Sequence, residues 1–211
     1  STSESIEITK MADSLGVDGI MIVTPYYSKP SQHGILRHFE EISKITDLPI
    51  MAYNIPGRTS TLIELETLQT LVDDIGIHSI KDAVGDFEFS KKQLELLKDK
   101  ADIYSGNDNQ TYDFVINGGV GVVSVASHVV GDEISEMISF AKDNDLEKAE
   151  EINMQLSNLF EAIFEEPSPG PIKKILSESW EEVGEPLLPI TSITPELANK
   201  IRGFYKKIKE N

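Results

Sequence analysis

The chain has 211 residues, of which 19 are lysine or arginine and 36 are aspartate or glutamate, and it contains no cysteine. The formal net charge of −17 disfavours binding to nucleic acid and to anionic membrane surfaces, and the lack of cysteine excludes disulfides, thiolate metal sites and a cysteine nucleophile. No apolar run approaches the roughly 18 residues needed to cross a bilayer, and no signal peptide is recognisable, so we expect a cytoplasmic location.

The first predicted element is a helix. Ser1 and Glu4 have the spacing of a capping box, in which each side chain satisfies a backbone amide of the first turn. One face of this helix then carries four apolar residues: Ile8, Met11, Ala12 and Leu15. Because the chain opens on a helix with no strand before it, we expect it to be the later part of a longer protein.

Strands and helices alternate after this first helix. Five apolar runs are predicted as buried strands: 19–25, 48–56, 77–82, 101–108 and 119–127. Helical periodicity predicts helices between them at about 32–46, 64–74, 88–99 and 109–117. This alternation is typical of βαβ units and predicts an α/β fold with a parallel sheet.

The alternation stops near residue 144, and only helices are predicted beyond it. They cover 146–164, 171–182 and 195–208, with the proline-rich stretch "EEPSPGPIKK" after the first of them. We therefore expect two domains, a strand–helix part at 1–143 and a helical part at 144–211.

Polar side chains gather where the predicted strands end, which is the edge at which parallel sheets bind ligands. They are Thr24, Tyr26, Tyr27, Tyr53, Asn54, Arg58, Lys81, Asp82, Ser105, Asn107, Asp108, Ser124 and Ser127. Five strand ends of this kind in succession predict a single site. The four histidines show no metal-ligand spacing, and Asp82 and Asp108 are interpreted as hydrogen-bonding loop residues.

Lys81 is the most informative of these residues. A lysine in a desolvated pocket has a lowered pKa, so that its neutral amine can attack a carbonyl group; the alternative is a lysine that extends to solvent or pairs with Asp82. Schiff-base chemistry also needs a proton shuttle, for which the hydroxyl of Tyr53 is suitable. Arg58 in the same loop could hold a substrate carboxylate with its planar guanidinium group.

Several motifs together resemble, in order and spacing, those of the dihydrodipicolinate synthase/N-acetylneuraminate lyase family of pyruvate-dependent class I aldolases. They are "VTPYYSKPSQHG", "YNIPGRT", "IKDAVGD", "YSGND", "GGVGVVSVAS" and "EPSPGPIK". The resemblance implies a (β/α)8 barrel with a C-terminal helical domain, assembled as a homotetramer of tight dimers. Only five of the eight strands are identified in this chain, so we expect the barrel part to be incomplete and the chain alone to fold poorly.

The resemblance also implies roles for individual residues. Lys81 resembles the lysine that forms the Schiff base with pyruvate, and Tyr53 the tyrosine that relays protons. Tyr27 resembles a tyrosine that reaches into the partner's site across the dimer, and Arg58 the arginine that binds the carboxylate of L-aspartate 4-semialdehyde. The remaining matches are Gly106 and Val123, similar to pocket-lining residues, and Tyr26 and Glu4, similar to a lysine-binding regulatory site.

The implied reaction is condensation of pyruvate with aspartate semialdehyde to 4-hydroxy-tetrahydrodipicolinate, a step of lysine biosynthesis through diaminopimelate, with no cofactor. Arg58 favours this reaction over cleavage of N-acetylneuraminate or another keto-sugar acid, because relatives with those substrates generally lack an arginine in this loop. A non-catalytic, truncated paralogue is the other alternative, and the joint presence of Lys81, Tyr53, Tyr27 and Arg58 argues against it. The segment that would supply a threonine pair for the pyruvate carboxylate in relatives has no counterpart here.

Overall fold

The computed structural model describes residues 1–210. Contacts between Cα atoms divide the chain into two compact units. The first unit comprises Ser1–Asn107 together with Asn117–Val123, and the second comprises Asp108–Ile116 together with the chain from Ser124 onward. The expected domain boundary at 143/144 was based on where strand–helix alternation stops, and it stays a prediction.

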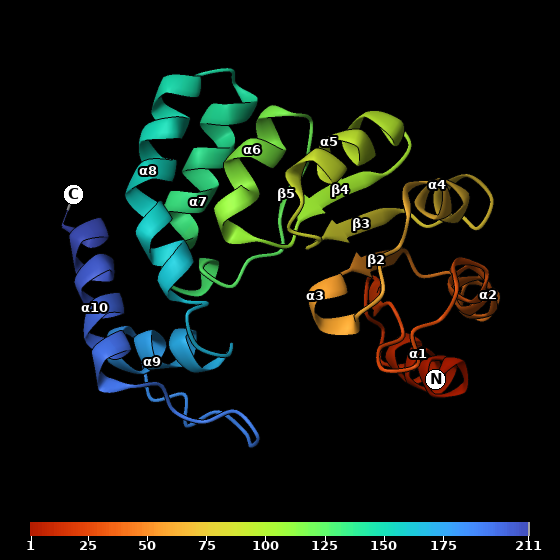
Figure 1. Cartoon of the computed structure of the whole chain (residues 1–211), viewed down its shortest axis with the longest axis horizontal. Coiled ribbons are helices and arrows are strands. Elements are labelled where there is room, and N and C mark those ends of the chain that lie inside the picture. The colour runs from red at the N-terminus through yellow and green to blue at the C-terminus, as the bar shows by residue number, and fades with distance from the viewer. Residues whose placement is uncertain (211) are drawn as a thin grey trace. The chain divides into compact units, whose positions relative to one another are not determined.

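The first unit is built on a parallel sheet whose five strands lie in chain order, as the alternating pattern predicted (Figure 1). The strands are β1 (Ile20–Val23), β2 (Ile50–Asn54), β3 (Ser79–Asp82), β4 (Asp102–Ser105) and β5 (Gly121–Val122). Five helices accompany them: α1 (Thr2–Ser14), α2 (Gln32–Ser43), α3 (Pro56–Thr59), α4 (Leu65–Asp73) and α5 (Phe87–Leu96). The predicted α/β class with a parallel sheet is confirmed.

The core of this unit lies between one face of the sheet and the helices. Alternate strand residues point to that face, and Ala52, Ile80 and Ile103 are buried there. Helices α2 and α4 supply the opposing apolar side chains, among them Phe39 and Leu68, both 0% exposed. Since the even-numbered residues of β2 and β3 are used for packing, Tyr53 and Lys81 project from the other face.

Helix α1 begins with the predicted capping box: the Ser1 hydroxyl accepts from the Glu4 amide, and the Glu4 side chain reaches back to the backbone of Ser1. Its predicted apolar face does not pack within this chain, since Ile8, Met11 and Leu15 are 64–75% exposed. The face that contacts α2 is a more polar one and includes the buried Thr9.

Helices make up the second unit: the 3-10 turn η1 (Asp108–Gln110), α6 (Thr111–Ile116), α7 (Ser127–Lys142), α8 (Leu146–Ala162), α9 (Gly170–Ser179) and α10 (Pro195–Lys209). Val115, Met137, Ala141 and Ala149 form one buried cluster that joins α6, α7 and α8. The helices predicted at 109–117, 146–164, 171–182 and 195–208 are confirmed to within a few residues at each end.

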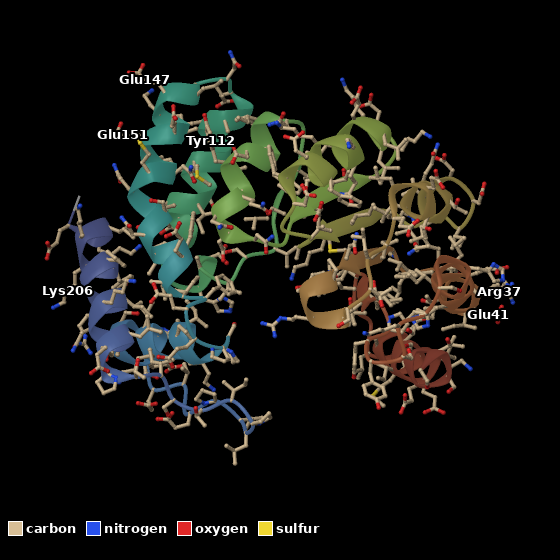
Figure 2. The ribbon with its side chains drawn as sticks, in the orientation of Figure 1. Arg37, Glu41, Tyr112, Glu147, Glu151 and Lys206 are labelled. Carbon is tan, nitrogen blue, oxygen red and sulfur yellow. The ribbon has the colours of Figure 1, made fainter. Side chains whose placement is uncertain are left out.

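Charged pairs cover the outer surfaces of the helices. Figure 2 shows Arg37 and Glu41 side by side on the outer side of α2, where Arg37 Nη2 lies 2.9 Å from Glu41 Oε1. Both side chains are more than 40% exposed, so this ion pair at i, i+4 spacing supports the helix by only a few tenths of a kcal/mol.

Two elements differ from the sequence prediction. The strand predicted at 119–127 contains only Gly121–Val122, because the backbone amides of Val125 and Ala126 both donate to the Asp108 carboxylate, 3.1 Å away in each case, and the chain then enters α7. Helix α7 was not predicted, because its first residues continue the β-prone run. The four-residue helix α3 was likewise not predicted, since it contains Pro56 and Gly57.

Candidate active site

Lys81 and Tyr53 come together because strands β2 and β3 pair in register. Tyr53 is paired with Lys81 across the two strands, and Lys81 Nζ lies 4.1 Å from the centroid of the Tyr53 ring. Both side chains are partly buried. The structure therefore brings these two residues together at the carboxyl ends of neighbouring strands, as expected. A cation at this distance interacts favourably with the ring face.

The Tyr53 side chain is partly buried and lies within the electrostatic influence of the positively charged Arg58. Burial raises the pKa of Tyr53 above its usual value, and the positive charge of the Arg58 guanidinium acts in the opposite direction. The protonated phenol is thus the resting form at neutral pH. Thr24, at the end of β1, lies on the other side of β2, and its backbone N–H and its hydroxyl both donate to the Tyr53 carbonyl oxygen at 3.3 Å.

Asp82 fixes the backbone directly after Lys81. Its carboxylate accepts from the amide of Val84 at 2.8 Å and from the Ser90 hydroxyl at 2.9 Å, and it is 1% exposed. Burial raises the pKa of Asp82, while these two hydrogen bonds favour its charged form. Asp82 therefore anchors the loop that follows Lys81, as the sequence indicated. Because successive residues of a strand point to opposite faces of the sheet, the Asp82 side chain lies on the face opposite to that of Lys81.

Gly106 leaves the space that the Lys81 side chain occupies. A Cβ atom at this position would lie 2.8 Å from Ala83 Cβ and 3.1 Å from Lys81 Cε. The Gly106 amide also donates to the Asp82 carbonyl at 2.6 Å, which closes β4 onto β3. Val123, the other predicted lining residue, continues β5 by donating its amide to the Ser105 carbonyl at 2.9 Å, and it is partly buried.

Arg58 occupies the last turn of α3 and is exposed. It follows the end of β2 by four residues, and the positive charge of its guanidinium group acts on the Tyr53 side chain. A cation with five donors beside a lysine–tyrosine pair is suited to holding a carboxylate of a bound molecule.

Three residues of the predicted site lie outside this cluster. Tyr26 and Tyr27 follow β1 with exposed fractions of 68% and 95%, so neither ring packs within the chain. Tyr27 has a φ of +65°, a conformation that non-glycine residues adopt at a cost of about 1–3 kcal/mol. Glu4 is engaged in the capping box of α1. The roles expected for Tyr26, Tyr27 and Glu4 stay predictions.

Asn54 and Gln32 are polar residues whose role the sequence did not indicate. Both use side-chain amides to hold the backbone at residues 62–64, at the far end of the Arg58 loop. The position of Asn54 at a strand end was a visible signal, but Gln32 lies about 30 residues earlier and carries none.

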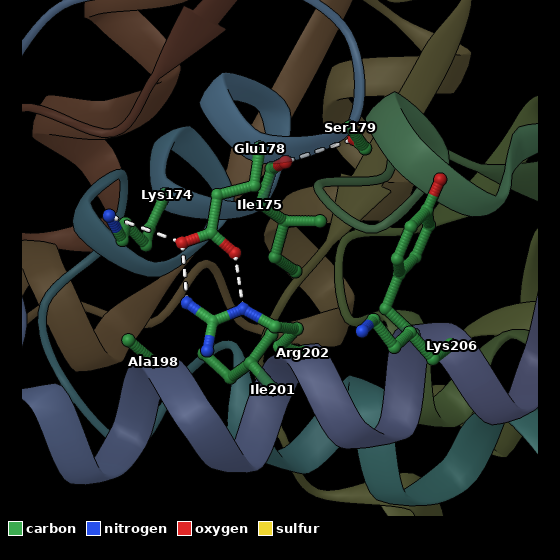
Figure 3. Close-up of a pocket in the computed structure, with 9 residues that line it drawn as sticks. Lys174, Ile175, Glu178, Ser179, Ala198, Ile201, Arg202 and Lys206 are labelled. Carbon is green, nitrogen blue, oxygen red and sulfur yellow. Dashed lines mark hydrogen bonds and ion pairs between the residues drawn. The ribbon is translucent and has the colours of Figure 1, made fainter.

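A cavity of about 400 Å³ lies in the second unit between α9 and α10 (Figure 3). Glu178 is bound there by Arg202 through two hydrogen bonds of 2.7 and 2.6 Å, and Lys174 lies 3.2 Å from the same carboxylate. Because the Glu178 carboxylate is already held by two cations of the same unit, the cavity is a weaker candidate for catalysis than the Lys81 cluster. Within residues 1–210 no three histidine, aspartate or glutamate side chains converge as a metal site. In the same part of the chain, no helix has the length and apolar character needed to span a membrane.

The fold and the cluster define the class: an α/β protein of the (β/α)8-barrel type, of which the described residues form five parallel strands, with a lysine and a tyrosine at adjoining strand ends. A sequence model of the dihydrodipicolinate synthetase family matches residues 1–208. The chain belongs to that family.

Individual relatives agree with this membership. The chain is 42% identical over 195 residues to 4-hydroxy-tetrahydrodipicolinate synthase 1 of Halalkalibacterium halodurans, an alignment that covers 92% of this chain and 66% of that protein. The crystal structure of dihydrodipicolinate synthase from Cyanidioschyzon merolae with lysine bound is similar at a TM-score of 0.95 and 39% identity, over 99% of this chain and 71% of that one.

A second solved structure is that of the chloride-inhibited dihydrodipicolinate synthase from Acinetobacter baumannii complexed with pyruvate. It is similar at a TM-score of 0.95 and 33% identity, over 99% of this chain and 72% of that one. The chain thus spans about two thirds to three quarters of the length of these relatives.

Proposed function

We propose that the protein is a 4-hydroxy-tetrahydrodipicolinate synthase, which condenses pyruvate with L-aspartate 4-semialdehyde. The observation that carries this proposal is the pairing of Lys81 with Tyr53, with Nζ 4.1 Å from the tyrosine ring centroid, next to the loop of Arg58. The names of the similar proteins support it, as does the relative crystallised with pyruvate.

In this proposal Lys81 is the nucleophile and Tyr53 the proton carrier. The neutral amine of Lys81 attacks C2 of pyruvate, and the carbinolamine loses water with a proton supplied through Tyr53, which leaves an imine. Loss of a proton from the methyl group then gives an enamine, whose carbon attacks the aldehyde of the second substrate. The amino group of that substrate finally displaces Lys81 from C2 as the ring closes, so the lysine is regenerated and one water is released overall.

Arg58 would bind the carboxylate of aspartate semialdehyde. Its exposure leaves the guanidinium group accessible to a ligand, and a bidentate contact to a carboxylate is both strong and directional. This feature favours the synthase over N-acetylneuraminate or keto-sugar-acid cleavage, whose second substrates present hydroxyl groups. A non-catalytic role does not require the lysine, the tyrosine and the arginine together.

The exposed residues fit an oligomer. Tyr27, 95% exposed and in a costly backbone conformation, is proposed to enter the site of a second copy across a dimer interface. Tyr26 and Glu4 are proposed to contribute to a lysine-binding regulatory site, in line with the relative crystallised with lysine. The reaction uses the protein's own lysine in place of an organic cofactor.

The proposal is tested by steady-state kinetics of the intact protein with pyruvate and either aspartate semialdehyde or, in the cleavage direction, N-acetylneuraminate. We expect turnover with the semialdehyde and little with the sugar acid. Arg58→Ala should raise the KM for the semialdehyde by roughly ten- to a hundredfold, with Arg58→Lys restoring only part of the loss. Preference for the sugar acid, or an unchanged semialdehyde KM in Arg58→Ala, would contradict the choice of substrate.

A further inference from the structure

The loop that carries Arg58 has little stability of its own. Helix α3 has four residues, and its backbone bonds are limited to one turn: the amides of Arg58 and Thr59 donate to the Ile55 carbonyl, and the Ser60 amide donates to Pro56. A single helical turn is not stable in isolation, because nucleation costs more than one turn returns. Ser60 then turns the chain with a φ of +58°. The position of Arg58 must therefore be fixed from outside α3.

Asn54 holds the far end of this loop from inside the core. Its side-chain N–H donates to the Ile63 carbonyl at 3.0 Å, and its side-chain oxygen accepts from the Ile63 amide at 3.0 Å. Asn54 and Ile63 are both 0% exposed. Because Asn54 immediately follows Tyr53 on β2, this pair of bonds closes the loop back onto the strand that carries the tyrosine.

Gln32 holds the same segment from the other side. Its side-chain N–H donates to the Leu62 carbonyl at 2.8 Å, and its side-chain oxygen accepts from the Glu64 amide at 3.1 Å. In an extended segment, the backbone polar groups of successive residues point to opposite sides, so those of residues 62 and 64 face Gln32 and those of residue 63 face Asn54. The two amides thus act as short strand neighbours on either side of residues 62–64, and the backbone there has little freedom to move.

We infer that Asn54 and Gln32 form a two-sided amide clamp that positions Arg58, and so sets the affinity for the acidic group of the second substrate. Binding sites of this directional kind require placement to within about 0.5 Å, and a guanidinium group on a loose loop cannot keep it. Thr59 supplies a further tie inside the loop, since its hydroxyl lies 3.0 Å from the carbonyl oxygens of Ile55 and Thr61. This inference rests on the proposed function.

The test uses Gln32→Ala and Asn54→Asp in the intact protein. Gln32 lies partly exposed at the start of α2, so its replacement removes two hydrogen bonds without opening the core. Asn54→Asp keeps the acceptor for the Ile63 amide but loses the donor to the Ile63 carbonyl. We expect each variant to raise the semialdehyde KM by roughly three- to tenfold, with little change in the KM for pyruvate. His33→Ala, which replaces the exposed neighbour of Gln32, is the matched control and should behave as wild type.

A double variant separates positioning from general destabilisation. If Gln32 acts through Arg58, then Gln32→Ala added to Arg58→Ala should raise the semialdehyde KM no further than Arg58→Ala alone. An unchanged KM in Gln32→Ala, or an equal fold-change on the Arg58→Ala background, would overturn the inference even if Asn54→Asp fails to fold. Lack of semialdehyde turnover in the wild-type protein would instead overturn the proposed function, so the two failures are distinguishable.

Discussion

Lys81 and Tyr53 occupy paired positions on adjacent parallel strands, and the lysine nitrogen lies over the tyrosine ring at 4.1 Å from its centroid. The relationship follows from strand register, because two residues at the ends of neighbouring strands with the same side-chain direction must be neighbours. The buried alternate residues Ala52 and Ile80 set that direction, so the packing of the sheet determines which face receives the lysine.

Gly106→Ala should block formation of the pyruvate adduct. The new methyl group would lie 2.8 Å from Ala83 Cβ and 3.1 Å from Lys81 Cε, closer than real Cβ atoms tolerate without movement of their neighbours. We expect the rate of imine formation to fall at least tenfold, measured by trapping with borohydride. Gly203→Ala in α10 is the control, since nothing lies within 4 Å of the added atom. Equal adduct rates in the two variants would contradict this steric reading.

His38 should make the stability of the first unit depend on pH. Its side chain is buried, Nδ1 lies 2.9 Å from Thr2 Oγ1, and burial lowers the pKa of the imidazole below 6.5. A group with a lowered native pKa stabilises the fold above its unfolded pKa, and this contribution is lost as pH falls.

The experiment on His38 compares urea unfolding at pH 7.5 and pH 5.5. The wild type should lose on the order of 1 kcal/mol of unfolding free energy between these values, and His38→Gln should lose less. His33→Gln, on the same helix but exposed, should match the wild type. Equal losses of unfolding free energy in the wild type and in His38→Gln between these pH values would contradict a neutral buried imidazole at this position.

The ion pair between Glu178 and Arg202 should stabilise α9 against α10 (Figure 3). Hydrogen bonds from Arg202 are the main reason that the pKa of Glu178 is lowered to about 2. The stabilisation that the ion pair adds to the free energy of unfolding is fully present above the usual glutamate pKa and is lost as pH falls through about 2. Since the two side chains are 30% and 39% exposed, solvent screening keeps the effect small.

Glu178→Gln should therefore be slightly less stable than wild type at pH 7, and the difference should shrink toward acid pH. Carboxyl NMR titration of the wild type gives the Glu178 pKa directly. Glu181→Gln, an exposed position just beyond α9, is the control. A Glu178 pKa near the usual value of about 4.3 would show that the two hydrogen bonds do not persist in solution.

The sequence predicted those parts of the fold in which local pattern and tertiary packing agree. The buried strands appear in the sequence as continuous apolar runs, and the apolar residues of α2 and α8 recur with helical periodicity. The strands and these two helices could therefore be predicted. Helix α7 was not predicted, because the preceding strand is ended by hydrogen bonds that the backbone amides of Val125 and Ala126 donate to the Asp108 carboxylate, which lies much earlier in the chain. A bond between distant residues leaves no periodic signal.

The candidate site divides in the same way. The positions of Lys81, Tyr53 and Arg58 could be predicted because each lies at or just after the end of a strand, and because their motifs resemble a known family. The clamp formed by Gln32 and Asn54 could not, since it depends on side-chain amides that meet the backbone of residues 62–64 only after folding.

Reductive trapping at Lys81 tests the central claim most directly. The intact protein is incubated with pyruvate and borohydride, digested, and analysed by mass spectrometry, with Lys81→Ala as the control. The proposed chemistry predicts a reduced pyruvyl adduct on the peptide that contains Lys81, and no adduct in the variant. An adduct that persists in Lys81→Ala, or no adduct on the wild-type protein, would contradict the assignment of Lys81 as the Schiff-base lysine.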